Sequence, residues 1–149
     1  MRKINYLVIH CSSTKATQSY TVAQMEKDHK ARGFNSAGYN YYIRRSGEII
    51  PLRPIEVVPA QVAGHNADAV GICYEGGMSA SGGPEDNRTL QQKASLVKLL
   101  KELKSKFPNA KIVGHRDFSP DLNHDGKITP NEWIKWCPSF DAKNEYKNL

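Results

Sequence analysis

The chain has 149 residues and a formal net charge of +6, which is about the length of one domain and enough to bury a core without disulfide bonds. A hydrophobic fraction of 39% and a charged fraction of 24% exclude a disordered or fibrous chain. No apolar run approaches the roughly 20 residues that cross a bilayer, and three cysteines are too few for a disulfide framework. The positive charge favours an anionic partner, such as a nucleic acid, an anionic lipid or a cell-wall polymer.

The N-terminus lacks the pattern of a secretory signal. Residues 4–9 form a short apolar run, whereas a signal peptide has an apolar stretch of about 7–15 residues followed by a small-residue cleavage site. We therefore expect that the protein stays in the cytoplasm after synthesis, that it is exported by another route, or that the sequence begins after the cleavage site of a signal peptide.

Short apolar runs bounded by turn residues predict the strands of a sheet. The expected strands are 4–9, 39–45, 48–52, 70–74 and 111–114. Ser46-Gly47 would form the turn of a hairpin between the second and third of them. Residues 78–88 are polar and predict a surface loop.

Two threonines mark the starts of the main helices. Thr21 and Thr89 are each followed three residues later by glutamine, the spacing of a capping box. The first helix would end at Gly33 and the second before Pro108, with leucines on its buried face at 96, 99, 100 and 103. Further helices are expected from Thr129-Pro130 and after a cap at Ser139. The order of elements predicts one domain over residues 1–149 of the α/β (α+β) class, with a central mixed sheet flanked by helices.

Two histidines follow directly after predicted strands. His10 ends the first strand and His115 ends the last, and Cys137 lies 22 residues beyond His115. Ligand sites assemble at strand ends of open sheets, and two histidines with one cysteine are a plausible zinc set with one open position. By residue type alone, hydrogen-bonded histidines and an inert buried thiol remain the alternative.

Five motifs occur in a fixed order along the chain: V-I-H-C-S-S-T, G-Y-N-Y-Y-I-R-R-S-G-E-I, G-H-N-A-D-A-V-G-I-C-Y-E-G-G, V-G-H-R-D and C-P-S-F-D. Together they resemble the zinc-dependent N-acetylmuramoyl-L-alanine amidases of the phage-lysozyme and peptidoglycan-recognition-protein group, from Ile4 to Asp141. The resemblance implies the fold of that group and hydrolysis of the amide bond between N-acetylmuramic acid and L-alanine in peptidoglycan.

The resemblance also implies roles for individual residues. It makes His10, His115 and Cys137 the zinc ligands, and it makes Tyr39 and Lys135 catalytic. Bound zinc lowers the pKa of its water to about 7, and a phenol and an ammonium group nearby would stabilise the oxyanion of the tetrahedral intermediate. Without the resemblance, we would expect Tyr39 to pack within the sheet and Lys135 to be a solvent-exposed lysine on a helix.

Other residues receive weaker assignments. The resemblance places His65 in the substrate groove, together with Asn66, and gives His29 a packing or supporting role. Cys11 and Cys73 are expected to pack near strand ends.

An insertion at about residues 119–134 departs from the family pattern. Residues 121–132 match the calcium-loop pattern D-x-[DN]-x-[DN]-G-x₅-E. The expected calcium ligands are Asp121, Asn123, Asp125, Lys127 through its carbonyl, and Glu132. Turns formed without metal are the alternative, because Asp, Asn and Gly favour turns and Glu132 also fits a capping box with Thr129.

The sequence therefore predicts a zinc amidase, with a structural calcium ion as a further cofactor. Its expected partner is peptidoglycan or a muropeptide, with no nucleic acid and no membrane partner, and the chain is expected to be a monomer. The missing signal fits a phage or prophage lysin that acts on the cell wall after release, and it fits a cytoplasmic recycling enzyme or a shortened sequence equally well. The alternative is a non-catalytic peptidoglycan-binding module on the same fold. Such relatives typically lack the cysteine ligand, so Cys137 favours the enzyme.

Overall fold

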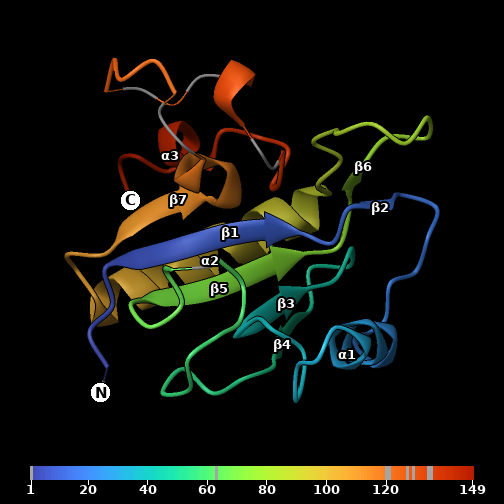
Figure 1. Ribbon diagram of the computed structural model, residues 1–149. Coiled ribbons are helices and arrows are strands. Elements are labelled where there is room, and N and C mark those ends of the chain that lie inside the picture. The colour runs from blue at the N-terminus through green and yellow to red at the C-terminus, as the bar shows by residue number, and fades with distance from the viewer. Residues whose placement is uncertain (1, 63, 120–121, 127, 129, 134–135) are drawn as a thin grey trace.

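The computed structural model describes residues 2–62, 64–119, 122–126, 128, 130–133 and 136–149 (Figure 1). Five strands form one mixed sheet in the order β4-β3-β5-β1-β7. Their bounds are β1 Tyr6–Cys11, β3 Tyr41–Ile43, β4 Ile49–Pro51, β5 Ala69–Tyr74 and β7 Lys111–Gly114. Strands β3, β5, β1 and β7 are parallel to one another, and β4 pairs antiparallel with β3. The predicted mixed sheet and hairpin are confirmed.

Strand β1 lies inside the sheet, between β5 and β7. It pairs Ile9 with Gly114 of β7 and His10 with Cys73 of β5. Strands that are buried on both faces consist of nearly continuous apolar residues, as β1 and β5 do. Because the strands are parallel, their carboxyl ends meet at one edge of the sheet.

Different helices pack against the two faces of the sheet. Leu7, Ile9 and Cys11 of β1 face helix α2 (Leu90–Lys106), which lies behind the sheet in Figure 1. Its buried residues include the four predicted leucines, Leu96, Leu99, Leu100 and Leu103. Side chains alternate between faces along a strand, so Val8 and His10 point away from α2. On that opposite side, Met25 of α1 (Val22–Ala31) packs with Tyr42 and Cys73.

The helix caps agree with the sequence in part. Thr89 and Gln92 form the complete capping box of α2. Thr21 caps α1 by accepting a hydrogen bond from the Gln24 backbone N–H at 3.1 Å, and Gly33 follows with a φ of 94°. The reciprocal hydrogen bond, from the Thr21 backbone N–H to the Gln24 side chain, does not form, and the Gln24 amide nitrogen donates to Asp28 Oδ1 at 2.8 Å.

The C-terminal region differs from the prediction. Where a helix was expected from Thr129, the described residues form one 3-10 turn, Pro130–Glu132. The last helix, α3 (Ala142–Glu145), is capped by Asp141 and not by Ser139. The Ser139 hydroxyl donates to the Gly77 carbonyl at 2.9 Å, a long-range contact that its local sequence does not reveal.

Two further features were not predicted. Strands β2 (Thr14–Lys15) and β6 (Gly77–Met78) form a small parallel pair, so the segment expected to be a polar loop begins as a strand. A 3-10 helix over His115–Phe118 continues β7. In the described parts of the chain, no helix is both long and apolar enough to cross a membrane.

Candidate metal centre

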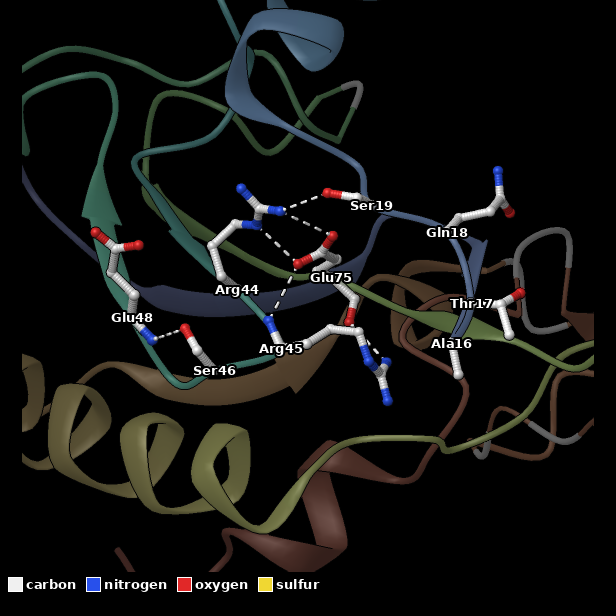
Figure 2. A pocket seen from close by; sticks show the side chains of 9 residues that line it. All are labelled: Ala16, Thr17, Gln18, Ser19, Arg44, Arg45, Ser46, Glu48 and Glu75. Atoms are coloured by element: carbon white, nitrogen blue, oxygen red, sulfur yellow. Dashed lines mark hydrogen bonds and ion pairs between the residues drawn. The ribbon is translucent and has the colours of Figure 1, made fainter.

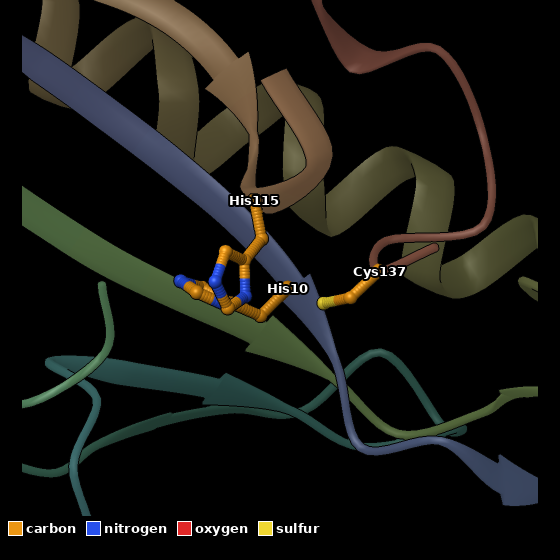
Figure 3. Close-up of side chains that lie close together, drawn as sticks. All are labelled: His10, His115 and Cys137. Carbon is orange, nitrogen blue, oxygen red and sulfur yellow. The ribbon is translucent and has the colours of Figure 1, made fainter. Parts of the chain in front are cut away.

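The three residues predicted as zinc ligands come together at the carboxyl edge of the sheet. One ligand atom from each of His10, His115 and Cys137 lies within 4.8 Å of the other two (Figure 3). His10 is near the end of β1 and His115 directly follows β7, the adjacent strand. The Ile9–Gly114 pairing therefore places the two histidines side by side, with ring centroids 4.8 Å apart.

Backbone contacts hold Cys137 against both strands. The Cys11 backbone N–H donates to Cys137 Sγ at 3.0 Å, and the Arg116 backbone N–H donates to the Cys137 carbonyl at 2.9 Å. A hydrogen bond from a backbone N–H stabilises a thiolate. The cysteine is thus placed by residues that adjoin the two histidines in the chain.

Burial sets the protonation of these groups. His10 is 1% exposed, and its burial, together with the neighbouring His115, lowers its pKa to about 3. Its imidazole is therefore neutral near pH 7, the form that binds metals. Burial raises the pKa of the Cys137 thiol well above its usual value, so a metal must displace a proton to bind a thiolate there.

Tyr39 lies beside this cluster. Its ring centroid is 5.0 Å from that of His10, and it lines a cavity of about 350 Å³ together with all three candidate ligands. Burial and the nearby cysteine thiols raise the pKa of Tyr39 well above 10. The phenol therefore keeps its proton and can act as a hydrogen-bond donor.

His29 supports the wall of the same cavity. Its Nδ1 accepts the Gly38 backbone N–H at 2.8 Å, and its ring packs edge-on against Tyr39 and Phe34. The predicted supporting role agrees with these contacts.

The two predicted substrate residues do not line this cavity. The His65 ring packs against Phe118 and Tyr6, with centroid distances of 4.4 and 5.8 Å. The Asn66 side-chain oxygen accepts the backbone N–H groups of Gln61 and Val62, each at 2.9 Å. A substrate contact by His65 or Asn66 stays a prediction.

Part of the predicted chemistry lies outside the described residues. This holds for Lys135 and for two of the calcium-loop positions, Asp121 and Lys127. Among the remaining loop positions, Glu132 is 4% exposed and its Oε2 accepts the backbone N–H groups of Leu122 and Asn123. Asp125 accepts a hydrogen bond from the Asn123 side chain at 3.3 Å. Calcium binding stays a prediction.

Gln61 was not predicted as a residue of the site. Gln61 lines the cavity, and its Oε1 contacts His10 Nε2. Gln61 lies in an irregular segment 51 residues from His10, and no local pattern marks it.

A larger cavity, of about 480 Å³, lies elsewhere along the same edge of the sheet (Figure 2). Its central carboxylate, Glu75, accepts hydrogen bonds from Arg44 Nε and the Tyr20 backbone N–H, both at 2.7 Å. Burial works to raise the pKa of Glu75, but these donors overcome it and lower the pKa below 4.5. The pairing joins β3, β5 and the segment before α1, so we assign this cluster a structural role.

Comparisons with known proteins show the family to which the chain belongs. The model of a family described as N-acetylmuramoyl-L-alanine amidase matches residues 1–138. The endolysin of Klebsiella phage KP32 is 36% identical over 142 residues, which cover 95% of this chain and 85% of the relative.

Solved structures share the fold. The N-acetylmuramoyl-L-alanine amidase LysC from Clostridium intestinale superposes with a TM-score of 0.74 at 26% identity, covering 97% of this chain and 82% of LysC. Drosophila PGRP-LB superposes with a TM-score of 0.73, covering 100% of this chain and 82% of that chain. At 21% identity, this second likeness shows the fold alone.

Proposed function

Because this chain belongs to the N-acetylmuramoyl-L-alanine amidase family, we propose that it cleaves the bond between N-acetylmuramic acid and L-alanine with one zinc ion held by His10, His115 and Cys137. The family membership confirms the resemblance predicted from the five sequence motifs. The family shows that the chain is an amidase, and we add the proposal that its activity depends on zinc.

The donor set is the observation that carries this proposal. Two imidazoles and one thiol converge within 4.8 Å, and nitrogen and sulfur are ligands that zinc prefers. Catalytic zinc sites typically have three protein ligands and one open position, and here the three side chains line an open cavity. When bound, zinc supplies a water of lowered pKa and polarises the substrate carbonyl.

The protein's own groups would complete the chemistry. A neutral His10 and a single thiolate from Cys137 leave a divalent site with a net charge of about +1, which preserves its Lewis acidity. The protonated Tyr39 hydroxyl would donate a hydrogen bond to the oxyanion as the carbonyl is attacked. Lys135 would supply a second donor and a proton for the departing amine.

The cavity beside the candidate ligands is also lined by Tyr39 and by Arg32 and Phe34, which follow α1 in the chain. We propose peptidoglycan or a muropeptide as the substrate and the cell wall as the place of action, as in a phage or prophage lysin. A recognition module without activity is the alternative, and the presence of Cys137 favours the enzyme.

The test combines metal analysis with wall hydrolysis. The wild type should bind one zinc ion, clear suspensions of purified cell walls, and release amino groups without new reducing ends. Cys137→Ala should lose both zinc and activity while keeping its circular dichroism spectrum, and Ser105→Ala, an exposed helix position, should behave as the wild type. Full activity of Cys137→Ala would refute the assigned site. Zinc binding without hydrolysis would favour the recognition module.

A further inference from the structure

We propose that Gln61 is a positioning residue of the metal centre, which holds His10 in the tautomer with its proton on Nε2 and leaves Nδ1 free for the metal. This inference rests on the proposed zinc site. It adds a residue that neither the family motifs nor the strand-end pattern pointed to.

The side-chain amide of Gln61 has only one orientation that satisfies both of its neighbours. Its Nε2 donates to the His65 carbonyl at 3.5 Å, and its Oε1 contacts His10 Nε2. A carbonyl oxygen can only accept a hydrogen bond, so the amide nitrogen must face His65 and the amide oxygen must face His10.

That orientation decides the tautomer of His10. An amide oxygen is an acceptor, so the His10 Nε2 that it contacts must carry the proton. A neutral imidazole has one N–H, which leaves Nδ1 with the lone pair that a metal requires. Ligand histidines commonly donate their other N–H to an oxygen in this way, which fixes the ring and raises its basicity.

The turn that carries Gln61 is itself held in place. Asn66 Oδ1 accepts the backbone N–H groups of both Gln61 and Val62 at 2.9 Å, and the His65 N–H donates to the Val62 carbonyl at 3.0 Å. Asn66 therefore acts on Gln61, and through it on His10. The G-H-N motif would thus serve the metal centre by shaping this turn.

The sheet leaves room for the Gln61 side chain. Gly71 of β5 pairs with Val8 of β1, and a Cβ built on Gly71 would lie 3.1 Å from Gln61 Cγ and 3.4 Å from Cδ. Side chains of Val8 and His10 share that face of the sheet. The missing side chain at Gly71 lets Gln61 lie across β5 and reach His10.

The experiment compares two substitutions of Gln61. Gln61→Met keeps the length of the side chain but removes its oxygen, and Gln61→Glu keeps an acceptor for His10 while losing the amide donor to His65. Gln91→Met, at an exposed position of α2, is the matched control. Zinc dissociation constants come from competition with a chelator. Nitrogen-15 NMR of the histidine side chains, recorded with zinc removed, reports which His10 nitrogen carries the proton.

We expect the wild type to show the proton of His10 on Nε2. Gln61→Met should bind zinc about 10- to 100-fold more weakly, the usual cost of losing such a supporting contact. Gln61→Glu and Gln91→Met should bind zinc at least as tightly as the wild type. A loss that appears with Met and is rescued by Glu separates the acceptor role from simple packing.

Three results would overturn the inference: His10 protonated on Nδ1 in the wild type, Gln61→Met binding zinc as the wild type does, or Gln61→Glu binding as weakly as Gln61→Met. If Gln61→Met does not fold, the tautomer of His10 in the wild type still decides, and Gln61→Glu binding zinc more weakly than the wild type would also overturn the inference. A wild type that binds no zinc refutes the proposed function. In that case the NMR measurement alone decides whether Gln61 sets the tautomer.

Discussion

Gly114 directly precedes His115 and lies against Pro138, which directly follows Cys137, so a methyl group on Gly114 should weaken the metal centre. Its φ of −95° and ψ of 162° are open to any residue, which makes Gly114→Ala a purely steric change. The added Cβ would lie 2.6 Å from Pro138 Cδ and 3.2 Å from Cγ. Pro138 follows Cys137 directly, so relief of the clash moves the cysteine away from the histidine.

The size of the effect follows from these distances. Carbon atoms pack at roughly 3.5–4.0 Å, so the new contact is about 1 Å too short, whereas metal–ligand distances tolerate only about 0.2 Å. Without metal, the Cys137 segment can move aside, but metal binding draws it back against the methyl group. Overpacking of this kind costs about 1–3 kcal/mol, which corresponds to a zinc affinity about 5- to 150-fold weaker.

Chelator competition measures the zinc dissociation constant, and thermal unfolding of the zinc-depleted protein checks the fold. Gly83→Ala is the matched control, because its Cβ would meet only Ser79 Oγ at 3.7 Å, an ordinary contact. Zinc binding by Gly114→Ala within about twofold of the wild type, or an equal loss of affinity in Gly83→Ala, would show that the contact with Pro138 does not control the metal centre.

Two other sites give further predictions. Tyr39→Phe should lower the rate of wall hydrolysis about 10²- to 10³-fold, because one hydrogen-bond donor to the oxyanion is lost. Its zinc affinity should equal that of the wild type. If Tyr39→Phe hydrolyses cell walls as fast as the wild type does, Tyr39 has no part in the mechanism. Arg88→Met should lower the free energy of unfolding, measured in urea, by about 2–4 kcal/mol. The Arg88 side chain is 1% exposed and forms ion pairs with Asp86 and Glu145, both at 2.8 Å. Its guanidinium carbon also lies 3.4 Å from the centroid of the Phe140 ring. The hydrogen bond from Arg88 lowers the pKa of Glu145, so this pair stabilises the fold above the pKa of about 4.3 in the unfolded chain and loses that effect in acid. The stability difference between wild type and Arg88→Met should therefore be smaller at pH 3 than at pH 7, and a difference that grows in acid would contradict the pairing.

Local patterns predicted most of the sheet and both long helices. The apolar runs of β1 and β5 are strands because they are buried on both faces, and the Thr89–Gln92 capping box begins α2. Prediction was weaker after His115, where the chain has few periodic apolar residues. There the expected helix at Thr129 is a 3-10 turn in the described residues, and the last helix begins two residues later than a cap at Ser139 implied.

The sequence alone was enough to name the residues of the candidate metal centre. The ordered motifs, read with strand ends at His10 and His115, were sufficient to name both histidines, Cys137 and Tyr39. The structure brings the two histidines and Cys137 together, because parallel strands have their carboxyl ends at one edge of the sheet whatever the connecting segments are.

The contacts that hold these residues could be seen only in the folded chain. The Cys11 N–H that contacts Cys137, the Gln61 oxygen that contacts His10, and the close approach of Gly114 to Pro138 join segments that are distant in the chain or have no local signature. Such contacts depend on the packing of whole strands and turns against one another, which no short stretch of sequence encodes. The candidate ligands could therefore be named from the sequence, and the contacts that hold them together are visible only in the fold.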